Sequence, residues 1–176
     1  MCLKDSLIIF IDNAYLKKVY SFYNKSNFNF DIKKFSMNLA KENKLFCKKI
    51  YLYDAPPFEN NSLKMEKYNS FKKYLKKRNI FIREGKLQKI SDRYTQKGVD
   101  SLLTMDLLIN SFEKNAFNFI IITADTDFVP VIAEVKNKAI KVILYCLINK
   151  SRHFFLSNHL LSICDEVKII KETHFN

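Results

Sequence analysis

The chain has 176 residues, a length that suits one domain with a substantial core, and 48% of its residues are hydrophobic, as in a globular protein. Its formal charge is +12, from 30 basic and 18 acidic side chains. The sequence holds only two glycines, which nearly excludes a glycine-rich dinucleotide-binding loop or a P-loop, and no flexible linker is apparent. We therefore expect a single domain over residues 1–176.

The positive charge is unevenly distributed along the sequence. Residues 1–97 carry 22 basic and 9 acidic side chains, whereas residues 98–176 carry 8 and 9. A basic half beside an acid-bearing half suits a polyanion laid across a metal centre. A solvated lysine surface explains the same distribution equally well, so the positions of the acids have to decide between the two interpretations.

The first half of the chain alternates between apolar runs and helical patterns. The run Leu7–Ile11 predicts a buried strand that ends at Asp12, and a second strand over 45–53 ends at Asp54, where two prolines follow. Polar residues 85–98 predict an irregular segment or a hairpin. The remaining patterns predict a strand over 79–83 and helices over 14–23, 31–44 and 63–78, the last with a lysine-rich face.

The helix predicted over 99–114 has a carboxylate on its apolar face. One stripe of this helix holds Asp106 together with Val99, Leu102 and Leu103. A carboxylate in such a place is costly unless it is paired or bound to a metal. Asp106 is therefore a candidate metal ligand, and a buried acid satisfied by the backbone or by a lysine is the alternative. Asp100 lies in the first turn, where an acid also interacts favourably with the helix dipole.

The most informative stretch begins with the apolar run Phe119–Ile122, which is typical of a strand buried on both faces. Asp125 and Asp127 follow it, and a helical pattern covers 128–138. Two neighbouring carboxylates repel each other, and a divalent cation relieves the repulsion. The alternative is that Asp127 caps the helix and Asp125 shapes the turn. The chain then continues with a strand over 140–145, a helix over 154–164 and a strand over 167–171.

The alternation of strands and helices predicts a mostly parallel sheet with helices on both faces. Asp12 and Asp125 then lie at the same edge of the sheet, where open α/β sheets bind their ligands. Asp100 and Asp106 reach that edge only if segment 85–98 brings their helix there. Ligands that are all oxygens select Mg²⁺ or Mn²⁺ rather than zinc.

Other chemistries find no support in the sequence. The four cysteines form no CxxC pair and no zinc-binding spacing, which favours reduced thiols; they are Cys2, Cys47, Cys146 and Cys164. No signal peptide and no membrane span is apparent, so we expect a cytoplasmic protein.

Three segments of the sequence occur in an informative order. They are Ile9–Asn13, Lys97–Asp100 together with Asp106, and Thr123–Ile132. In this order they resemble the signatures of the NYN domain, in the LabA-like branch of the PIN-like nucleases, and Leu160–Val167 is similar to the closing segment of that family. The resemblance covers nearly the whole chain. It implies a PIN-like three-layer sandwich and a metal-dependent ribonuclease, whose acids match Asp12, Asp100, Asp106, Asp125 and Asp127.

The chain departs from this family pattern at two positions. Ala124 stands in place of the usual glycine. Tyr15 stands three residues after the first acid, where the family often has an asparagine that supports the metal or the substrate.

We therefore expect a nuclease that depends on Mg²⁺ or Mn²⁺ and acts on single-stranded RNA. Metal binding is expected at Asp12, Asp106, Asp125 and Asp127, with Asp100 and Asp127 orienting water or a second ion. Phosphate binding is expected at Arg93, Lys97, Lys72 and Lys76. Two alternatives stay open: a non-catalytic RNA-binding or regulatory module, and a phosphohydrolase for small phosphoesters. The sequence is also compatible with a homodimer.

Overall fold

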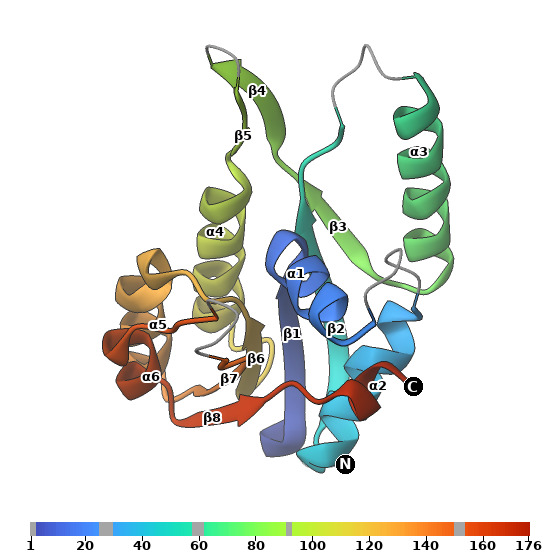
Figure 1. The fold of residues 1–176 in the computed structure, drawn as a ribbon. Coiled ribbons are helices and arrows are strands. Elements are labelled where there is room, and N and C mark those ends of the chain that lie inside the picture. Colours follow the sequence, from blue (N-terminus) through green and yellow to red (C-terminus); the bar gives the residue numbers. More distant parts are fainter. Residues whose placement is uncertain (1–2, 25–29, 58–61, 91–92, 150–153) are drawn as a thin grey trace.

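The structure is a computed structural model that describes residues 3–24, 30–57, 62–90, 93–149 and 154–176. Its centre is a six-stranded sheet. Every strand pairing in this sheet is parallel, and the strand order is β3-β2-β1-β6-β7-β8 (Figure 1). The strands are β1 (Ser6–Asp12), β2 (Phe46–Asp54), β3 (Phe81–Glu84), β6 (Asn118–Ile122), β7 (Lys141–Cys146) and β8 (Glu166–Ile169). The α/β fold with a mostly parallel sheet is confirmed.

The two central strands are apolar on both faces. All side chains of Leu7–Ile11 in β1 and of Phe119–Ile122 in β6 are fully buried. The strands are in register at Ile9 and Ile120, and the rings of Phe10 and Phe119 lie 4.9 Å apart. Such runs can only lie in the middle of a sheet that is covered on both sides, which explains why β1 and β6 occupy the centre.

The helices form two groups on opposite faces of the sheet. The helices are α1 (Asn13–Asn24), α2 (Ile32–Glu42), α3 (Ser62–Lys77), α4 (Val99–Phe112), α5 (Val129–Asn137) and α6 (Asn158–Ile163). The chain crosses the sheet in one direction from β1 to β3 and in the other from β6 to β8, and right-handed crossovers then place α1, α2 and α3 on one face and α4, α5 and α6 on the other. In agreement with this, α4 packs against α5 and α5 against α6.

A hairpin between β3 and α4 brings the start of α4 to the carboxyl edge of the sheet. Its antiparallel strands are β4 (Lys86–Ile90) and β5 (Arg93–Lys97), and they project beyond the end of β3 (Figure 1). The two glycines of the chain form its base. A Cβ atom on Gly85 would lie 2.6 Å from the carbonyl oxygen of Lys97, and Gly98 has a φ of +81° in the left-handed region. Close approach of the two hairpin ends therefore requires a glycine at 85.

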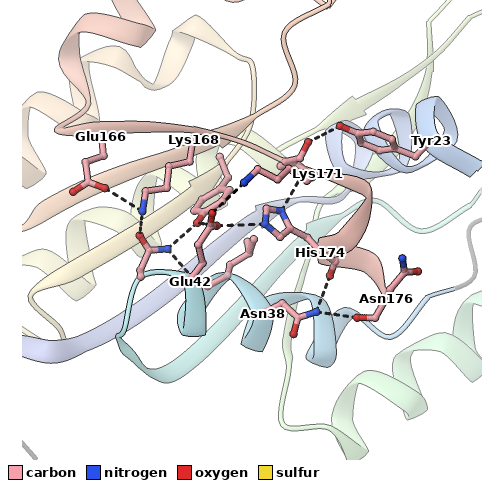
Figure 2. Close-up of polar contacts among 12 residues, drawn as sticks. Tyr23, Asn38, Glu42, Glu166, Lys168, Lys171, His174 and Asn176 are labelled. Atoms are coloured by element: carbon pink, nitrogen blue, oxygen red, sulfur yellow. Dashed lines mark hydrogen bonds and ion pairs between the residues drawn. The ribbon is translucent and has the colours of Figure 1, made fainter.

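The last residues of the chain pack against α2 through a polar network that we call the C-terminal clasp (Glu42, Tyr145, Lys171 and His174; Figure 2). The hydroxyl of Tyr145 donates to Oε2 of Glu42 at 2.5 Å, and Nε2 of His174 lies 3.3 Å from the same oxygen. Nζ of Lys171 lies 3.7 Å from Oε1 of Glu42. The clasp fastens the short 3-10 helix η4 (Glu172–Phe175) to the face that α2 covers.

The structure refines several boundaries that the sequence predicts. The helix predicted over 154–164 is limited to α6, because Phe154 pairs with Asn149 in an isolated bridge and Ser157 caps the helix. A separate 3-10 turn, η2 (Thr126–Phe128), precedes α5, and another, η1 (Leu3–Asp5), precedes β1. The hairpin predicted as one option over 85–98 is confirmed. No helix in the described ranges is long and apolar enough to cross a membrane.

Candidate active site at the carboxyl edge of the sheet

The strand order reverses between β1 and β6, and this switch point is where open α/β sheets bind ligands. The two strands pair in parallel up to Ile11 and Ile122. Asp12 is the last residue of β1, and Asp125 follows β6 by three residues. Two carboxylates therefore follow the ends of neighbouring strands on either side of the switch point.

Asp12 lies in a half-buried position at the start of α1. Its Oδ1 accepts a hydrogen bond from the backbone nitrogen of Tyr15 at 3.1 Å. Burial raises the pKa of Asp12, the backbone donors of Tyr15 and Ala14 oppose this effect, and the charge of Asp100 adds to the increase. The net result is a raised pKa, because the cost of removing the carboxylate from water exceeds the gain from its hydrogen bonds.

Asp125 and Asp127 flank the turn that leads from β6 to α5. Oδ1 of Asp125 accepts from the backbone nitrogen of Asp127 at 2.9 Å, and the backbone nitrogen of Asp125 donates to Oγ1 of Thr123 at 3.1 Å. Asp125 thus caps η2, whereas the side chain of Asp127 is exposed. The cap occupies one oxygen of Asp125 and accounts for the sharp turn after the strand.

Asp100 links these acids electrostatically. It lies in the first turn of α4, just after the base of the hairpin. Burial raises its pKa, and the charges of Asp125 and Asp127 raise it further. Since Asp100 also raises the pKa of Asp12, the four carboxylates form one interacting group, which we call the acid edge (Asp12, Asp100, Asp125 and Asp127). The hairpin therefore brings the start of this helix to the edge, as the sequence analysis requires.

Asp106 has a different environment, two turns further along α4. Its residue is only 6% exposed, as its position on the apolar stripe predicts. Oδ2 of Asp106 accepts from the hydroxyl of Tyr53 at 2.9 Å and from Nε of Arg83 at 2.8 Å. These partners belong to β2 and β3, so the carboxylate is directed toward that side of the sheet. Its role as a metal ligand stays a prediction.

A second polar group adjoins the acid edge at the end of β2. Asp54 is 2% exposed, and its Oδ2 accepts from Nδ2 of Asn13 at 2.5 Å and from Nζ of Lys17 at 3.0 Å. Oδ1 of Asn13 is buried and has no hydrogen-bond partner within the described part of the chain. Sequence reasoning identified Asp54 as a strand-end acid but left Asn13 without a role; its position directly after Asp12 was the available signal.

Tyr15, the residue that departs from the family pattern, has a structural contact. It is 7% exposed, and its hydroxyl accepts a hydrogen bond from the backbone nitrogen of Leu147 at 2.9 Å. Leu147 directly follows β7, so Tyr15 ties the first turn of α1 to the end of that strand. The tyrosine thus replaces a polar side chain near Asp12 with a packed one.

The predicted phosphate-binding residues do not all lie together. Lys97 is exposed at the end of β5, at the base of the hairpin that leads to Asp100. Arg93 belongs to β5, but its side chain lies outside the described residues. Lys72 and Lys76 line a cavity of about 700 Å³ between α3 and β3, and none of the acid-edge residues lines it. Nζ of Lys72 is also 2.6 Å from Oε2 of Glu84.

The acid edge has the donor chemistry that a hard divalent cation requires, although its side chains do not converge. Among the described residues, no group of three or more His, Cys, Asp or Glu side chains is arranged to hold a metal ion. In the structure, Asp12 and Asp125 each turn Oδ1 toward a backbone nitrogen. The group nevertheless consists of carboxylates that repel one another, and binding of Mg²⁺ or Mn²⁺ would relieve this repulsion.

Comparison with known proteins identifies the family. The model of the NYN domain family matches residues 6–170, which includes the whole acid edge. The chain belongs to the NYN domain family. NYN domains are generally nucleases, so the acids at the switch point of this NYN domain occupy the part of the fold where chemistry is expected.

A solved structure adds information on the fold alone. The NYN domain is similar to VPA0982, a protein of unknown function from Vibrio parahaemolyticus, with a TM-score of 0.70 and 16% identity over 99% of this chain and 98% of that chain. None of the curated proteins compared with the chain matches it. The similarity supports the α/β fold over the full length of both proteins.

Proposed function

We propose that this NYN domain is a metal-dependent ribonuclease of the LabA-like branch of the PIN-like nucleases. The observation that carries the proposal is the acid edge. Its carboxylates come from the end of β1, the start of α4 and the turn after β6, around the switch point of the sheet, and their charges interact. Burial and mutual repulsion raise the pKa of Asp12 and Asp100. A protein retains such an arrangement at a cost in stability, which points to function rather than to packing.

In this proposal Asp12, Asp125 and Asp127 hold Mg²⁺ or Mn²⁺, and Asp100 orients the attacking water. A bound dication would lower the pKa of that water and neutralise the charge that develops on a phosphodiester. Asp106 is a further predicted ligand of the metal, and its carboxylate accepts hydrogen bonds from Arg83 and Tyr53. The hydrogen bond between Asn13 and Asp54 positions the start of α1. It thereby positions the backbone nitrogen of Tyr15, which donates to Asp12 and orients its carboxylate.

RNA is the proposed substrate, single-stranded rather than double-stranded. Lys97 lies at the base of the hairpin that leads into the acid edge, where an exposed cation can hold a phosphate of the bound strand. The basic half of the sequence would supply further phosphate contacts over the longer range.

Cleavage of labelled single-stranded RNA in the presence of Mn²⁺ tests the proposal. The wild-type protein should cleave, and Asp125→Asn should reduce the rate by about two orders of magnitude or more, because it removes a charged ligand while keeping the shape. Asp5→Asn is the matched control, since Asp5 is an exposed acid just before the other end of β1. Equal cleavage by the wild type and by Asp125→Asn would reject the assigned roles.

A second candidate function is RNA binding without turnover. Tyr15 favours it, because the tyrosine hydroxyl is engaged with the backbone of Leu147 and takes the place of an asparagine that supports catalysis in the family. RNA binding that weakens with salt, with no cleavage under Mg²⁺ or Mn²⁺, would identify this function.

A further inference from the structure

A cavity of about 470 Å³ lies beside the acid edge, between α1, α3 and the hairpin. Lys17 of α1 and Asp54 at the end of β2 form one side of it, and Lys64, Lys67 and Phe71 of α3 form another. Leu87 and Gln96 of the hairpin also line it. Asp54 at the carboxyl end of β2 lines the cavity, and the hairpin and α3 both extend past this end of the sheet (Figure 1), so the cavity lies at the same edge as the acids.

The cavity is connected to the acid edge through neighbouring residues of β1 and β2. Asp12 pairs in register with Tyr53, so Asp54 lies one residue beyond that pair. Asn13, which follows Asp12 directly, donates its side-chain amide to Asp54. Paired strands lie about 4.8 Å apart, so the cavity begins about one strand spacing from Asp12. A chain molecule bound at Asp12 would therefore reach the cavity with its next unit.

The residues that line the cavity carry a net positive charge, from three lysines and one aspartate. Oδ2 of Asp54 accepts from Asn13 and Lys17, and Oδ1 accepts from the backbone nitrogen of Ala55 at 2.9 Å. Asp54 thus holds Lys17 at the cavity instead of contributing an uncompensated negative charge. Lys64 and Lys67 are exposed on the neighbouring turn of α3. Three lysines and one aspartate give a balance of charge that favours an anionic ligand.

The remaining wall of the cavity is aromatic and aliphatic. Phe71 is half-buried and Tyr68 is 9% exposed, and both line the cavity on α3. The hydroxyl of Tyr68 has no hydrogen-bond partner within the described part of the chain. Aromatic side chains next to lysines offer the two contacts that single-stranded nucleic acids use, which are stacking of a base and neutralisation of a phosphate. The volume also lies in the range of small-ligand pockets and can take one nucleotide.

We propose that this cavity is a binding site for one nucleotide of a single-stranded RNA, adjacent to the phosphate at the acid edge. The base packs against Phe71 and Leu87, and the phosphate lies at Lys64 and Lys67. The assignment rests on the proposed function for the class of substrate, since it treats RNA as the ligand of the acid edge. It adds a second point of contact, which selects a flexible strand, because a base held in a duplex cannot enter the cavity.

Binding of a fluorescent eight-nucleotide RNA, followed by anisotropy without divalent ions, tests the site independently of cleavage. The full chain carrying Asp125→Asn is the reference protein, so that the labelled strand stays intact. Phe71→Leu keeps an apolar side chain of similar size but removes the ring, and we expect it to weaken binding about tenfold. Phe112→Leu is the matched control, because it makes the same change at an exposed phenylalanine of α4 that does not line the cavity, and it should bind as the reference does.

Lysine variants test the phosphate contact. Lys64→Ala with Lys67→Ala should reduce the slope of log affinity against log salt by about 0.7, the value for one phosphate contact in a single strand. Lys77→Ala, on the same helix but not lining the cavity, should change the slope by much less. Equal slopes for the double variant and Lys77→Ala, together with unchanged binding by Phe71→Leu, would overturn the proposal.

A measurement on the unmutated chain protects the test against folding effects. RNA that carries 4-thiouridine should crosslink on irradiation to the peptide containing Tyr68 and Phe71, and excess uridine monophosphate should compete only at much higher concentration than unlabelled RNA. Crosslinks confined to other peptides, or competition by the mononucleotide at equal concentration, would refute an RNA site.

Absence of cleavage by the wild type under Mn²⁺ would refute the proposed ribonuclease without affecting these binding results.

Discussion

The C-terminal clasp and the acid edge use carboxylates in opposite ways. In the clasp, burial raises the pKa of Glu42, but the hydrogen bond from Tyr145 and the charges of His174 and Lys171 outweigh it, and the pKa is lowered overall (Figure 2). At the acid edge, burial and neighbouring acids raise the pKa of Asp12 and Asp100. The ionised form of the carboxyl is thus stabilised in the clasp and disfavoured at the acid edge.

This contrast separates carboxylates that stabilise the fold from those that are available to a ligand. Glu42 is surrounded by donors from β7 and from the end of the chain, so it gains nothing from a cation. At the acid edge, the charge of Asp100 instead raises the pKa of Asp12, and the charges of Asp125 and Asp127 raise the pKa of Asp100. Acids whose pKa is raised by burial and by neighbouring acids are typical of functional sites, whereas acids paired with cations are typical of packing.

Asp106 is the acid that tests this contrast most strongly, because it lies on the same helix as Asp100 but has partners like those of Glu42. We expect Arg83→Met to lower the free energy of unfolding by about 3 kcal/mol, because it removes the charged partner of a buried carboxylate and leaves the Tyr53 hydroxyl as its hydrogen-bond donor among the described side chains. For a chain of this size, this corresponds to a fall in Tm of about 9 °C, measured by circular dichroism.

The double variant Arg83→Met with Asp106→Asn is the control, since it removes the charge together with its partner and should recover part of the loss. Because Asp106 is the further predicted metal ligand, we also expect Asp106→Asn alone to reduce the increase in Tm that Mn²⁺ produces in the wild type. A Mn²⁺-induced increase that Asp106→Asn retains in full would instead assign Asp106 to packing alone.

The next largest effect is expected in the clasp. Glu42→Gln should lower the free energy of unfolding by about 2 kcal/mol at pH 7, because hydrogen bonds to a charged acceptor contribute about that much. The folded-state pKa of Glu42 is below its ordinary value of 4.5, so its contribution is fully present above pH 4.5 and is lost as the pH falls through the folded-state pKa. The difference in Tm between wild type and variant should therefore shrink below pH 4.5. A difference independent of pH would contradict the assignment.

The sequence predicts the acid edge better than the clasp for a physical reason. Asp12 and Asp125 follow apolar runs that only a central parallel strand accommodates, so their positions follow from local patterns. Gly85 and Gly98 mark the base of the hairpin that brings Asp100 to the edge. Both glycines are visible in the sequence, but the reason for Gly85 becomes clear only from the structure, where its backbone lies close to the carbonyl oxygen of Lys97. These features depend on backbone geometry, which sequence periodicity reports directly.

Side-chain partners are less predictable. The stripe on α4 predicts that Asp106 is buried, but not that Arg83 and Tyr53, from two other strands, would pair with it. Glu42 and His174 come from distant parts of the chain and belong to no periodic pattern, so the clasp has no sequence signal. Hydrogen bonds between distant polar residues depend on the final packing, and no local rule determines them.

The smallest predicted effect addresses the cost of the acid edge itself. Asp100→Asn should raise the free energy of unfolding by about 0.5 kcal/mol at neutral pH, because it removes one of several repelling charges that solvent partly screens. The folded-state pKa of Asp100 is above 3.8, so the folded form binds a proton more readily than the unfolded chain does, and ionisation costs stability as the pH rises through that pKa. The advantage of the variant should consequently appear above pH 4 and then level off. Denaturation by urea at several pH values measures it, with Asp5→Asn as the control. A loss of stability in Asp100→Asn at neutral pH would mean that Asp100 is a paired, structural acid like Glu42.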